Sequence, residues 1–340
     1  VELVLEQRKW ADRFLARLKA LAILLFSDKT SVILGFRGKG LAPRLEELEK
    51  RKPDAAWVVT FVHSLAVLNG CDPNSIILET QDIKFTKRRV RTNARITDLR
   101  VLMDIRSEAA VINTVSAVMA IASHEASYFK MISDRPEVFF IPDFAASALP
   151  PRLEKPQDYA YDFVFLGSDH VANIRGITGF IRDNTDWLEG RRLALCGSIC
   201  DNEEVLALAA QHDFIELRGF VEDLTDVFRG AAICLVPIDG TGLKIKILDA
   251  LAYSTPVLAS PSAIAALPGG YDTSVFPLDR TTAEQLLDNR DALREAENAA
   301  YGYLSELRSS KDLGALIRHI DTLPAKIAGE QRMAETIAAE

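Results

Sequence analysis

A lysine and an aspartate three residues apart follow a glycine-containing turn in the second half of the sequence. The turn is Gly240-Thr241-Gly242, and the charged pair is Lys246 and Asp249. A lysine in the first turns of a helix can meet a phosphate, and an acid one turn later can accept hydrogen bonds from ribose hydroxyls. The spacing therefore suits a sugar nucleotide. The alternative is a solvated ion pair on a helix surface, which is common at this spacing.

The elements that must position this pair are a strand, a loop, a helix and a second strand. An apolar strand ends at Pro237, and a helix begins near Gly242. Ile245, Leu248 and Ala252 recur at helical spacing, so we expect them to face a sheet. In an open parallel sheet, such a unit leaves the loop and the helix N-terminus at the carboxyl edge of the strands. Anionic ligands bind at that edge.

Three more glycine-containing loops are expected at the same edge, each following a predicted strand. They contain Gly167-Ser168 with Asn173, Cys196-Gly197-Ser198, and Gly219-Phe220-Val221. Backbone groups in such loops can read the edge of a base while leaving room for its ring. Each glycine alone would also fit an ordinary strand-to-helix turn, so the prediction rests on the joint arrangement.

Composition limits the classes of protein that this chain can represent. A length of 340 residues favours two domains, and a 48% apolar content suffices for two ordinary cores. The formal charge of -8 argues against general nucleic-acid binding. The four cysteines lack paired metal spacing, which favours reduced structural thiols in a cytoplasmic protein. The longest apolar run, Ala20 to Phe26, is too short to span a bilayer, so we expect any membrane contact to be peripheral.

The first part of the chain alternates predicted helices and strands, which implies a parallel sheet. An amphipathic helix is expected over residues 3–27. No strand is visible before it, so we expect the chain to begin inside its first domain. We expect strands at 31–34, 57–62, 75–79, 117–122 and 138–141, and a helical stretch over 96–113. The glycine-containing loop over 35–40 could cradle a phosphate, but a flexible surface loop is the simpler interpretation.

A strongly basic segment interrupts this acidic chain. From Lys84 to Arg100 there are seven basic residues against one acid; the first five are Lys84, Lys87, Arg88, Arg89 and Arg91. One interpretation is a docking surface for an anionic acceptor or for lipid headgroups. The other is a solvated basic helix or loop, and both remain open. Gln81 and Asp82 precede the segment, at the edge of the sheet where ligands gather.

Prolines between residues 142 and 156 predict the domain boundary, because proline interrupts both helices and sheet ladders. We therefore expect a domain over residues 1–145, a linker over 146–158, a second domain over 159–320 and a helical tail over 321–340. Six strands are expected in the second domain, at 162–166, 192–196, 214–217, 232–236, 256–259 and 273–276.

The ordered motifs of the second domain resemble the C-terminal half of retaining glycosyltransferases of the GT-B fold, in particular glycosyltransferase family 4, group 1. The resemblance rests on Leu166-Gly-Ser168 with Asn173 and Gly176, Leu195-Cys-Gly197, Leu217-Arg-Gly-Phe-Val-Glu-Asp-Leu224, and the segment from Pro237 to Ser260. It covers about residues 160–280. The N-terminal half matches the family's acceptor domain more loosely, through Leu78-Glu-Thr-Gln-Asp82 and Ala120-Ile-Ala-Ser-His-Glu125.

The resemblance implies an α/β fold of two Rossmann-like, doubly wound domains facing across a cleft. It also implies transfer of a sugar from a nucleotide-diphosphate donor to a glycan, lipid-linked or protein acceptor, with retention and without an obligatory metal. Lys246 and Arg175 would meet the diphosphate, and Asp249 the ribose. Phe220 and Val221 would border the base, and Gly240 to Gly242 would lie against the transferred sugar and phosphates.

Three positions depart from the family pattern. Its paired glutamates correspond here to Thr241 and Asp249, so the first acid is absent and the second is shorter by one methylene. The histidine often found after the N-terminal strand is Gln81, whose amide can orient a sugar hydroxyl but cannot shuttle a proton. Two alternatives to an active transferase therefore stay open: a binding module without turnover within a larger protein, and a sugar-nucleotide epimerase of the same fold.

Overall fold

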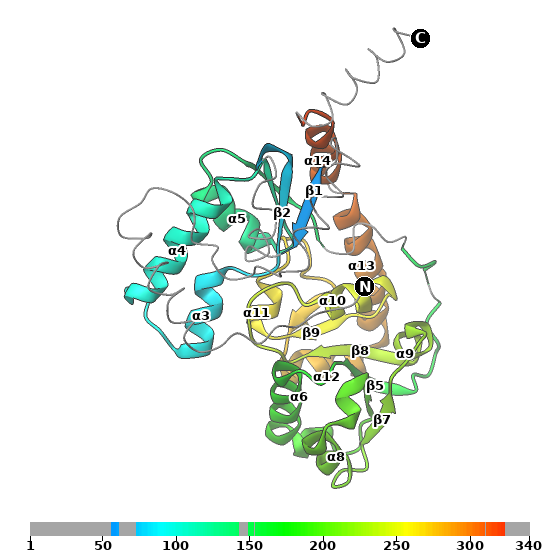
Figure 1. Ribbon diagram of the computed structural model, residues 1–340. Coiled ribbons are helices and arrows are strands. Elements are labelled where there is room, and N and C mark those ends of the chain that lie inside the picture. Colours follow the sequence, from blue (N-terminus) through cyan, green and yellow to red (C-terminus); the bar gives the residue numbers. More distant parts are fainter. Residues whose placement is uncertain (1–55, 61–72, 143–148, 153, 310, 324–340) are drawn as a thin grey trace. The chain divides into compact units, whose positions relative to one another are not determined.

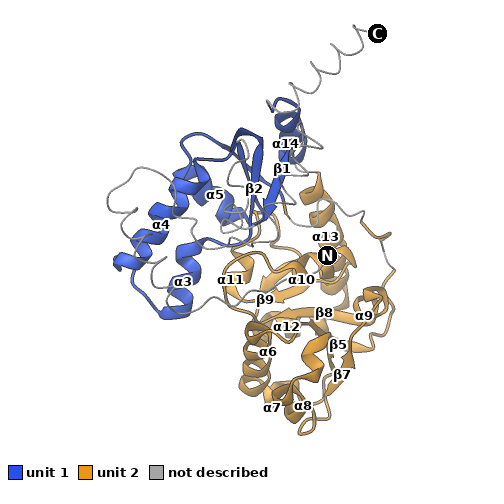
Figure 2. Cartoon of the chain, viewed as in Figure 1, with its two compact units in different colours: residues 1–141, 311–340 blue, residues 142–310 orange. Residues whose placement is uncertain are grey.

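The computed structural model describes residues 56–60, 73–142, 149–152, 154–309 and 311–323. The chain forms two compact units, one of residues 1–141 with 311–340 (unit 1) and one of residues 142–310 (unit 2) (Figure 2). The elements expected before residue 56 and most of the expected tail lie outside the described residues. The boundary at residue 310 differs from the expected domain of 159–320, because the last described helix packs on the first sheet.

The described residues of unit 1 form four parallel strands in the spatial order β1-β2-β3-β4. They are β1 (Trp57–Thr60), β2 (Ile76–Thr80), β3 (Ala117–Ala120) and β4 (Glu137–Phe140). Each begins within one residue of the start expected from the short β-rich runs. Leu78 pairs with Val118 across the middle of the sheet, and both side chains are fully buried. Continuous burial is typical of parallel strands covered on both faces.

The helices of unit 1 lie between these strands, except for the last. They are α3 (Lys84–Thr92), α4 (Leu99–Ile112), α5 (Ser123–Ile132) and α14 (Lys311–Asp321). Asn93 ends α3 in the left-handed conformation (φ 50°), which asparagine tolerates better than most residues. The helical periodicity expected over 96–113 is confirmed by α4. Helix α14 packs on β4, where Asp312 Oδ2 accepts a hydrogen bond from the Phe140 N–H at 2.8 Å.

Within the part of unit 2 that the structure describes, six parallel strands lie in the spatial order β10-β9-β8-β5-β6-β7. They are β5 (Tyr161–Leu166), β6 (Leu193–Cys196), β7 (Ile215–Gly219), β8 (Ala231–Val236), β9 (Val257–Ala259) and β10 (Val275–Pro277). All six expected strands are present. Every residue of β8 is buried, as its unbroken apolar sequence predicts for a central parallel strand.

Helices connect consecutive strands of unit 2 along the chain, as in a doubly wound domain (Figure 1). They are α6 (Val171–Asp183), α7 (Thr185–Leu188), α8 (Glu203–Ala209), α9 (Leu224–Gly230), α10 (Ile245–Ala252), α11 (Pro261–Ile264), α12 (Arg280–Asp288) and α13 (Arg290–Arg308). Among the described residues, none of the helices has the length and apolar composition that crossing a membrane would need.

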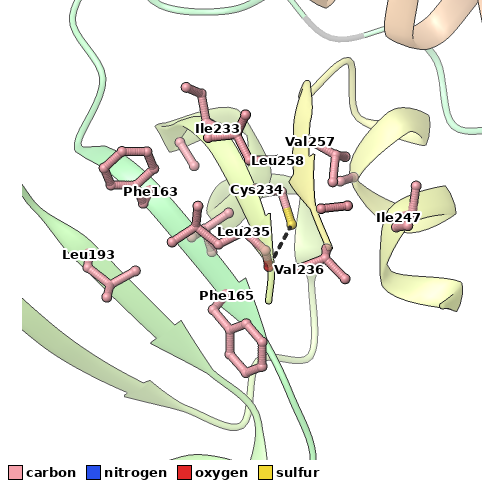
Figure 3. Packing of buried hydrophobic residues seen from close by; sticks show 14 of the residues in the cluster. Phe163, Phe165, Leu193, Ile233, Cys234, Leu235, Val236, Ile247, Val257 and Leu258 are labelled. Carbon is pink, nitrogen blue, oxygen red and sulfur yellow. Dashed lines mark hydrogen bonds between the residues drawn. The ribbon is translucent and has the colours of Figure 1, made fainter. Parts of the chain in front are cut away.

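Helix α10 packs on the sheet partly as expected, because Leu248 is buried, and partly through a residue that was not expected. The expected inward residues were Ile245, Leu248 and Ala252, but the Ile245 side chain is exposed. Ile247 is fully buried instead, and Figure 3 shows it on the side of α10 that faces Val257 of β9. The helix begins at Ile245 rather than near Gly242. That start leaves Ile245 at the open edge of the sheet, which is why the predicted stripe was wrong there.

The proline-rich segment between the units has no helix or strand over its described residues 149–152 and 154–158. It is held on α13 by hydrogen bonds to backbone carbonyls. Tyr301 Oη donates to the carbonyl of Pro150 at 3.1 Å, and Arg294 donates to the carbonyl of Pro156 at 3.1 Å. Lys155 is buried there, with its ammonium donating to Thr255 Oγ1 at 2.7 Å.

Candidate functional site

A pocket of about 340 Å³ opens at the carboxyl edge of the sheet of unit 2. Its walls come from the loops after β5, β6 and β7 and from helix α10. The lining residues are Leu166, Gly167, Ser168, Asn173, Gly197, Ser198, Phe220, Val221, Lys246 and Asp249. Eight of these were expected site residues: Gly167, Ser168, Asn173, Gly197, Phe220, Val221, Lys246 and Asp249. Leu166 and Asp249, which are 83 positions apart in the chain, therefore line the same pocket.

Lys246 is held by two contacts from outside its own helix. Its ammonium donates a hydrogen bond to Asn173 Oδ1 at 2.9 Å and lies 4.3 Å from the centre of the Phe165 ring. An ammonium over an aromatic face is attracted by the negative face of the ring. Burial is the main cause that lowers the pKa of Lys246 from 10.5 to about 8. The side chain is thus a partly desolvated cation that an anionic ligand would stabilise.

Asn173 joins this lysine to the loop after β5. Its Nδ2 donates to the Ser168 carbonyl at 3.0 Å and to Ser168 Oγ at 3.1 Å, while its Oδ1 accepts from Lys246. The two ends of the amide are therefore used for different partners, and the oxygen must face the lysine. Asn173 fixes the position of Lys246 relative to the loop.

Two glycines are required by the close approach of loops in this region. Gly197 has φ +99°, and a Cβ there would lie 2.2 Å from the Gly167 carbonyl oxygen. A Cβ at Gly176 would lie 2.3 Å from the Pro237 carbonyl oxygen, where α6 meets the end of β8. Any side chain at either position would have to separate backbone segments that line or support the pocket.

The loop Gly240 to Gly242 is organised by Lys244, which the sequence reasoning did not assign. The Lys244 ammonium donates hydrogen bonds to the carbonyls of Gly240, Thr241 and Gly242 at 3.3, 2.8 and 2.9 Å. Because a trans peptide points its N–H opposite to its C=O, the following N–H groups point away from this cation. Gly240, Thr241 and Gly242 do not line the pocket of about 340 Å³. They stay predicted donor residues.

Other expected site residues lie elsewhere. Arg175 is exposed on α6 and does not line the pocket. Gln81 follows β2 in unit 1, beside Asp82, whose Oδ2 accepts from Lys87 Nζ at 2.6 Å. Asn173 and Arg175 are two positions apart on α6, which puts their side chains on different faces of a helix.

The basic residues at the start of α3 are partly neutralised within unit 1. Lys84 lies 3.4 Å from Asp104, and Arg88 forms a forked ion pair with the same carboxylate. Hydrogen bonding to Asp104 raises the pKa of Arg88 further. Arg89 and Arg91, by contrast, are exposed. The expected group of five thus divides into three paired bases and two that face solvent.

Unit 1 also contains a buried acid that sequence reasoning missed. Glu108 accepts hydrogen bonds from the Lys84 N–H at 2.9 Å and from Tyr128 Oη at 3.1 Å. Its burial outweighs these contacts and raises its pKa from 4.5 to about 7. No local signal marks this role, because it depends on how α3 and α5 pack on α4. In the described part of the chain, no group of histidine, cysteine or acidic side chains could hold a metal ion.

Residues 160–289 match the family model for glycosyl transferases group 1. No curated protein sequence matches the chain. Among solved structures, sucrose-phosphate synthase of Thermosynechococcus elongatus is 13% identical with a TM-score of 0.58, over 90% of this chain and 81% of that one. The pneumococcal O-GlcNAc transferase GtfA, in complex with UDP and GlcNAc, is 12% identical with a TM-score of 0.56, over 85% of this chain and 61% of that one.

Anabaena Alr3699/HepE, in complex with UDP and glucose, is 12% identical with a TM-score of 0.55, over 88% of this chain and 82% of that one. At these identities the likeness concerns the fold. The expected α/β architecture of two parallel-sheet domains is confirmed, and the structural neighbours are GT-B glycosyltransferases. The expected resemblance to group 1 glycosyltransferases is confirmed over the second domain.

Proposed function

We propose that this chain, whose residues 160–289 match glycosyl transferases group 1, transfers a sugar from a nucleotide diphosphate to an acceptor hydroxyl. The observation that carries the proposal is the pairing of Lys246 and Asp249 on one wall of a pocket whose other walls are glycine loops and Phe220. A cation for a diphosphate, an acid for a ribose and an apolar edge for a base are the three contacts that a nucleotide donor needs.

Each of these residues has a proposed part in donor binding. The Lys246 ammonium meets the diphosphate, and Asp249 accepts hydrogen bonds from the ribose hydroxyls. Phe220 and Val221 border the base. Gly167, Ser168 and Gly197 supply backbone walls without bulky side chains. The N–H groups that follow the three carbonyls held by Lys244 contribute positive dipoles toward the transferred sugar and phosphates.

The proposed reaction retains the configuration of the sugar and needs no metal. The bond from the anomeric carbon to the diphosphate oxygen breaks, and a bond to the acceptor oxygen forms on the same face of the sugar. The leaving diphosphate takes the acceptor proton. The protein supplies positive charge and positioning, which can account for most of such an acceleration. Arg175, which does not line the pocket, would add a second cation only by reaching the leaving group from the exposed face of α6, and the Gln81 amide would orient an acceptor hydroxyl.

A uridine diphosphate sugar is the first donor to test. Two structures with the same fold hold UDP, one with GlcNAc and one with glucose. The proposed acceptor is a glycan, a lipid-linked saccharide or a protein, as in polysaccharide or glycoconjugate synthesis. We place the reaction in the cytoplasm, at the inner face of the membrane.

Donor hydrolysis tests the proposal. UDP, GDP and ADP sugars are incubated with the chain, and nucleotide diphosphate release is measured alongside thermal unfolding of the protein. A bound donor raises the free energy of unfolding by RT ln(1 + [L]/Kd). We expect stabilisation and slow release with one nucleotide class, both reduced in Lys246→Met.

Stabilisation without any release would favour the second candidate, a binding module without turnover. Gln81, which stands where the family often has a histidine, and Asp249, which stands where it has a longer glutamate, are the observations behind that alternative. No stabilisation by any nucleotide sugar would refute the proposed donor site. Lys130→Met is a matched control, because Lys130 is an exposed lysine on α5 of unit 1.

A further inference from the structure

The pairing of Lys84, Lys87 and Arg88 with acids leaves a distinct cationic surface beyond them. It is formed by the end of α3, the connecting turn and the start of α4. Its four arginines are Arg89, Arg91, Arg95 and Arg100, and all are exposed. The only acid within residues 84–102 is Asp98, whose Oδ2 accepts a hydrogen bond from the Arg95 N–H at 2.9 Å. Exposed positive charge is therefore concentrated on one hairpin of a chain whose formal charge is -8.

Large aliphatic side chains stand among these arginines and also face solvent. They are Val90 (67% exposed), Ile96 (44%), Leu99 (71%) and Leu102 (49%). Scattered exposed aliphatic residues are ordinary on protein surfaces, whereas four of them among four arginines within fourteen residues are not. We call these eight residues the arginine–aliphatic surface.

The helices beneath this surface are already packed through their other sides. Helix α4 buries Val101, Val111 and Ile112, and α3 is held to it through Arg88 and Asp104. Leu99 and Leu102 are therefore not needed to attach α4 to unit 1. Their exposure does not contribute to the fold, so a partner that covers them would gain the free energy of removing apolar surface from water.

We infer that the arginine–aliphatic surface docks unit 1 onto an anionic lipid bilayer. Guanidinium groups bind headgroup phosphates in forked hydrogen bonds, and long arginine stems reach the headgroup level while aliphatic neighbours enter the acyl boundary. A soluble anionic polysaccharide would satisfy the arginines and leave Val90 and Leu99 in water. The combination of both residue types selects the bilayer over a purely polar polyanion.

The net charge of the chain makes this docking directional. A protein with formal charge -8 is repelled as a whole by an anionic bilayer, so only the local field of the hairpin favours contact. That field acts over a Debye length of about 8 Å at physiological ionic strength and about 3 Å at 1 M salt. Binding should therefore be salt-sensitive at first contact and less so once aliphatic side chains have entered.

Vesicle sedimentation tests the arginines. The full chain is mixed with vesicles of phosphatidylcholine alone or with about one third phosphatidylglycerol, and the partition coefficient is measured. Each basic residue near an anionic surface contributes roughly a fivefold factor, so the double variant Arg89→Gln/Arg91→Gln should bind about 25-fold more weakly. The matched control is Arg135→Gln, an exposed arginine of unit 1 beyond the other end of α4. It should bind like the unchanged chain.

Fluorescence tests the aliphatic side chains. Leu99→Trp should shift its emission to the blue with anionic vesicles, because the indole leaves water, and Leu99→Ser should lower the partition coefficient about tenfold or more. Met131 is the control position, since it is 78% exposed and lies on α5 rather than on the hairpin. Met131→Trp should show no shift. Far-UV circular dichroism confirms that each variant is folded.

Three results would overturn the inference: equal binding to neutral and anionic vesicles, a Leu99→Trp spectrum unchanged by anionic vesicles, or a loss in Arg135→Gln equal to that of the double variant. Binding to a soluble anionic polysaccharide but not to vesicles would identify a glycan-docking surface instead, and would also overturn it. These measurements use no nucleotide sugar, so they stand apart from the test of donor binding.

Discussion

Replacing Lys246 by methionine should stabilise the ligand-free chain while it weakens nucleotide binding. Burial lowers the lysine pKa from 10.5 to about 8, so the charged form opposes folding. At 1.36 kcal/mol per pKa unit, the cost at pH 7 is roughly 3 kcal/mol. Between about pH 8 and 10.5 the unfolded chain binds more protons than the folded one, so stability rises with pH there. Lys246→Met removes that rise and most of the cost at pH 7.

The same lowered pKa predicts proton uptake when a nucleotide diphosphate binds. A diphosphate beside the ammonium should return the pKa of Lys246 to 10.5 or above. At pH 8.5 about a quarter of the free protein carries the proton and nearly all of the complex does, so binding takes up about 0.75 proton. At pH 7 the uptake falls to about 0.1 proton.

Calorimetry in buffers of different ionisation enthalpy measures this uptake. Binding by Lys246→Met should be weaker by about 1.5 to 3 kcal/mol, the value of a charge-assisted hydrogen bond, and its uptake should be smaller by about 0.75 proton at pH 8.5. Lys130→Met should behave as the unchanged chain. Equal uptake at pH 8.5 in Lys246→Met would show that another group takes the proton, and the position assigned to the diphosphate would be refuted.

Three further predictions concern residues around the two sites. Asn173→Asp should weaken donor binding more than Asn173→Ala, because the new carboxylate competes with the diphosphate for Lys246. Calorimetry measures both affinities. If Asn173→Ala bound the donor more weakly than Asn173→Asp, Asn173 would be excluded as the acceptor that positions the lysine. Asp249→Ala should lower the affinity for a ribonucleotide diphosphate by about 1 to 3 kcal/mol and leave that for its 2′,3′-dideoxy analogue unchanged, whereas equal losses would argue against ribose contact. The raised pKa of Glu108 contributes stability that is fully present below pH 4.5 and is lost as the pH rises to about 7. In the unchanged chain, the free energy of unfolding measured by urea titration should fall by roughly 3 kcal/mol over this pH range, and in Glu108→Gln this fall should be absent. The same pH dependence of the unfolding free energy in both proteins would contradict the assignment.

The pocket could be predicted largely from the sequence because its parts are tied to strand ends. Each of β5, β6 and β7 ends in a short glycine-containing loop, and parallel strands bring such ends to one edge of a sheet. The positions of Gly167, Gly197 and Val221 follow from that rule alone. The same holds for the strands themselves, which are short, apolar and separated by helices.

The remaining features depend on packing between segments that local patterns do not connect. Arg88 is neutralised by Asp104, sixteen residues away, because α3 lies against α4. Ile247 rather than Ile245 enters the core because α10 begins three residues later than the glycine turn indicates. Lys244 appears in sequence as one more cation beside Lys246, yet it is used to hold three carbonyls of the loop.

The return of α14 to the first sheet has a consequence for biosynthesis. Asp312 and Phe140, which hydrogen-bond to each other, are 172 residues apart in the chain. At typical ribosomal rates of 5 to 20 residues per second, β4 emerges roughly 10 to 30 s before its covering helix exists. Unit 2 is continuous and is synthesised in that interval. The side of β4 that α14 covers in the folded protein therefore stays without that helix until unit 2 has been synthesised.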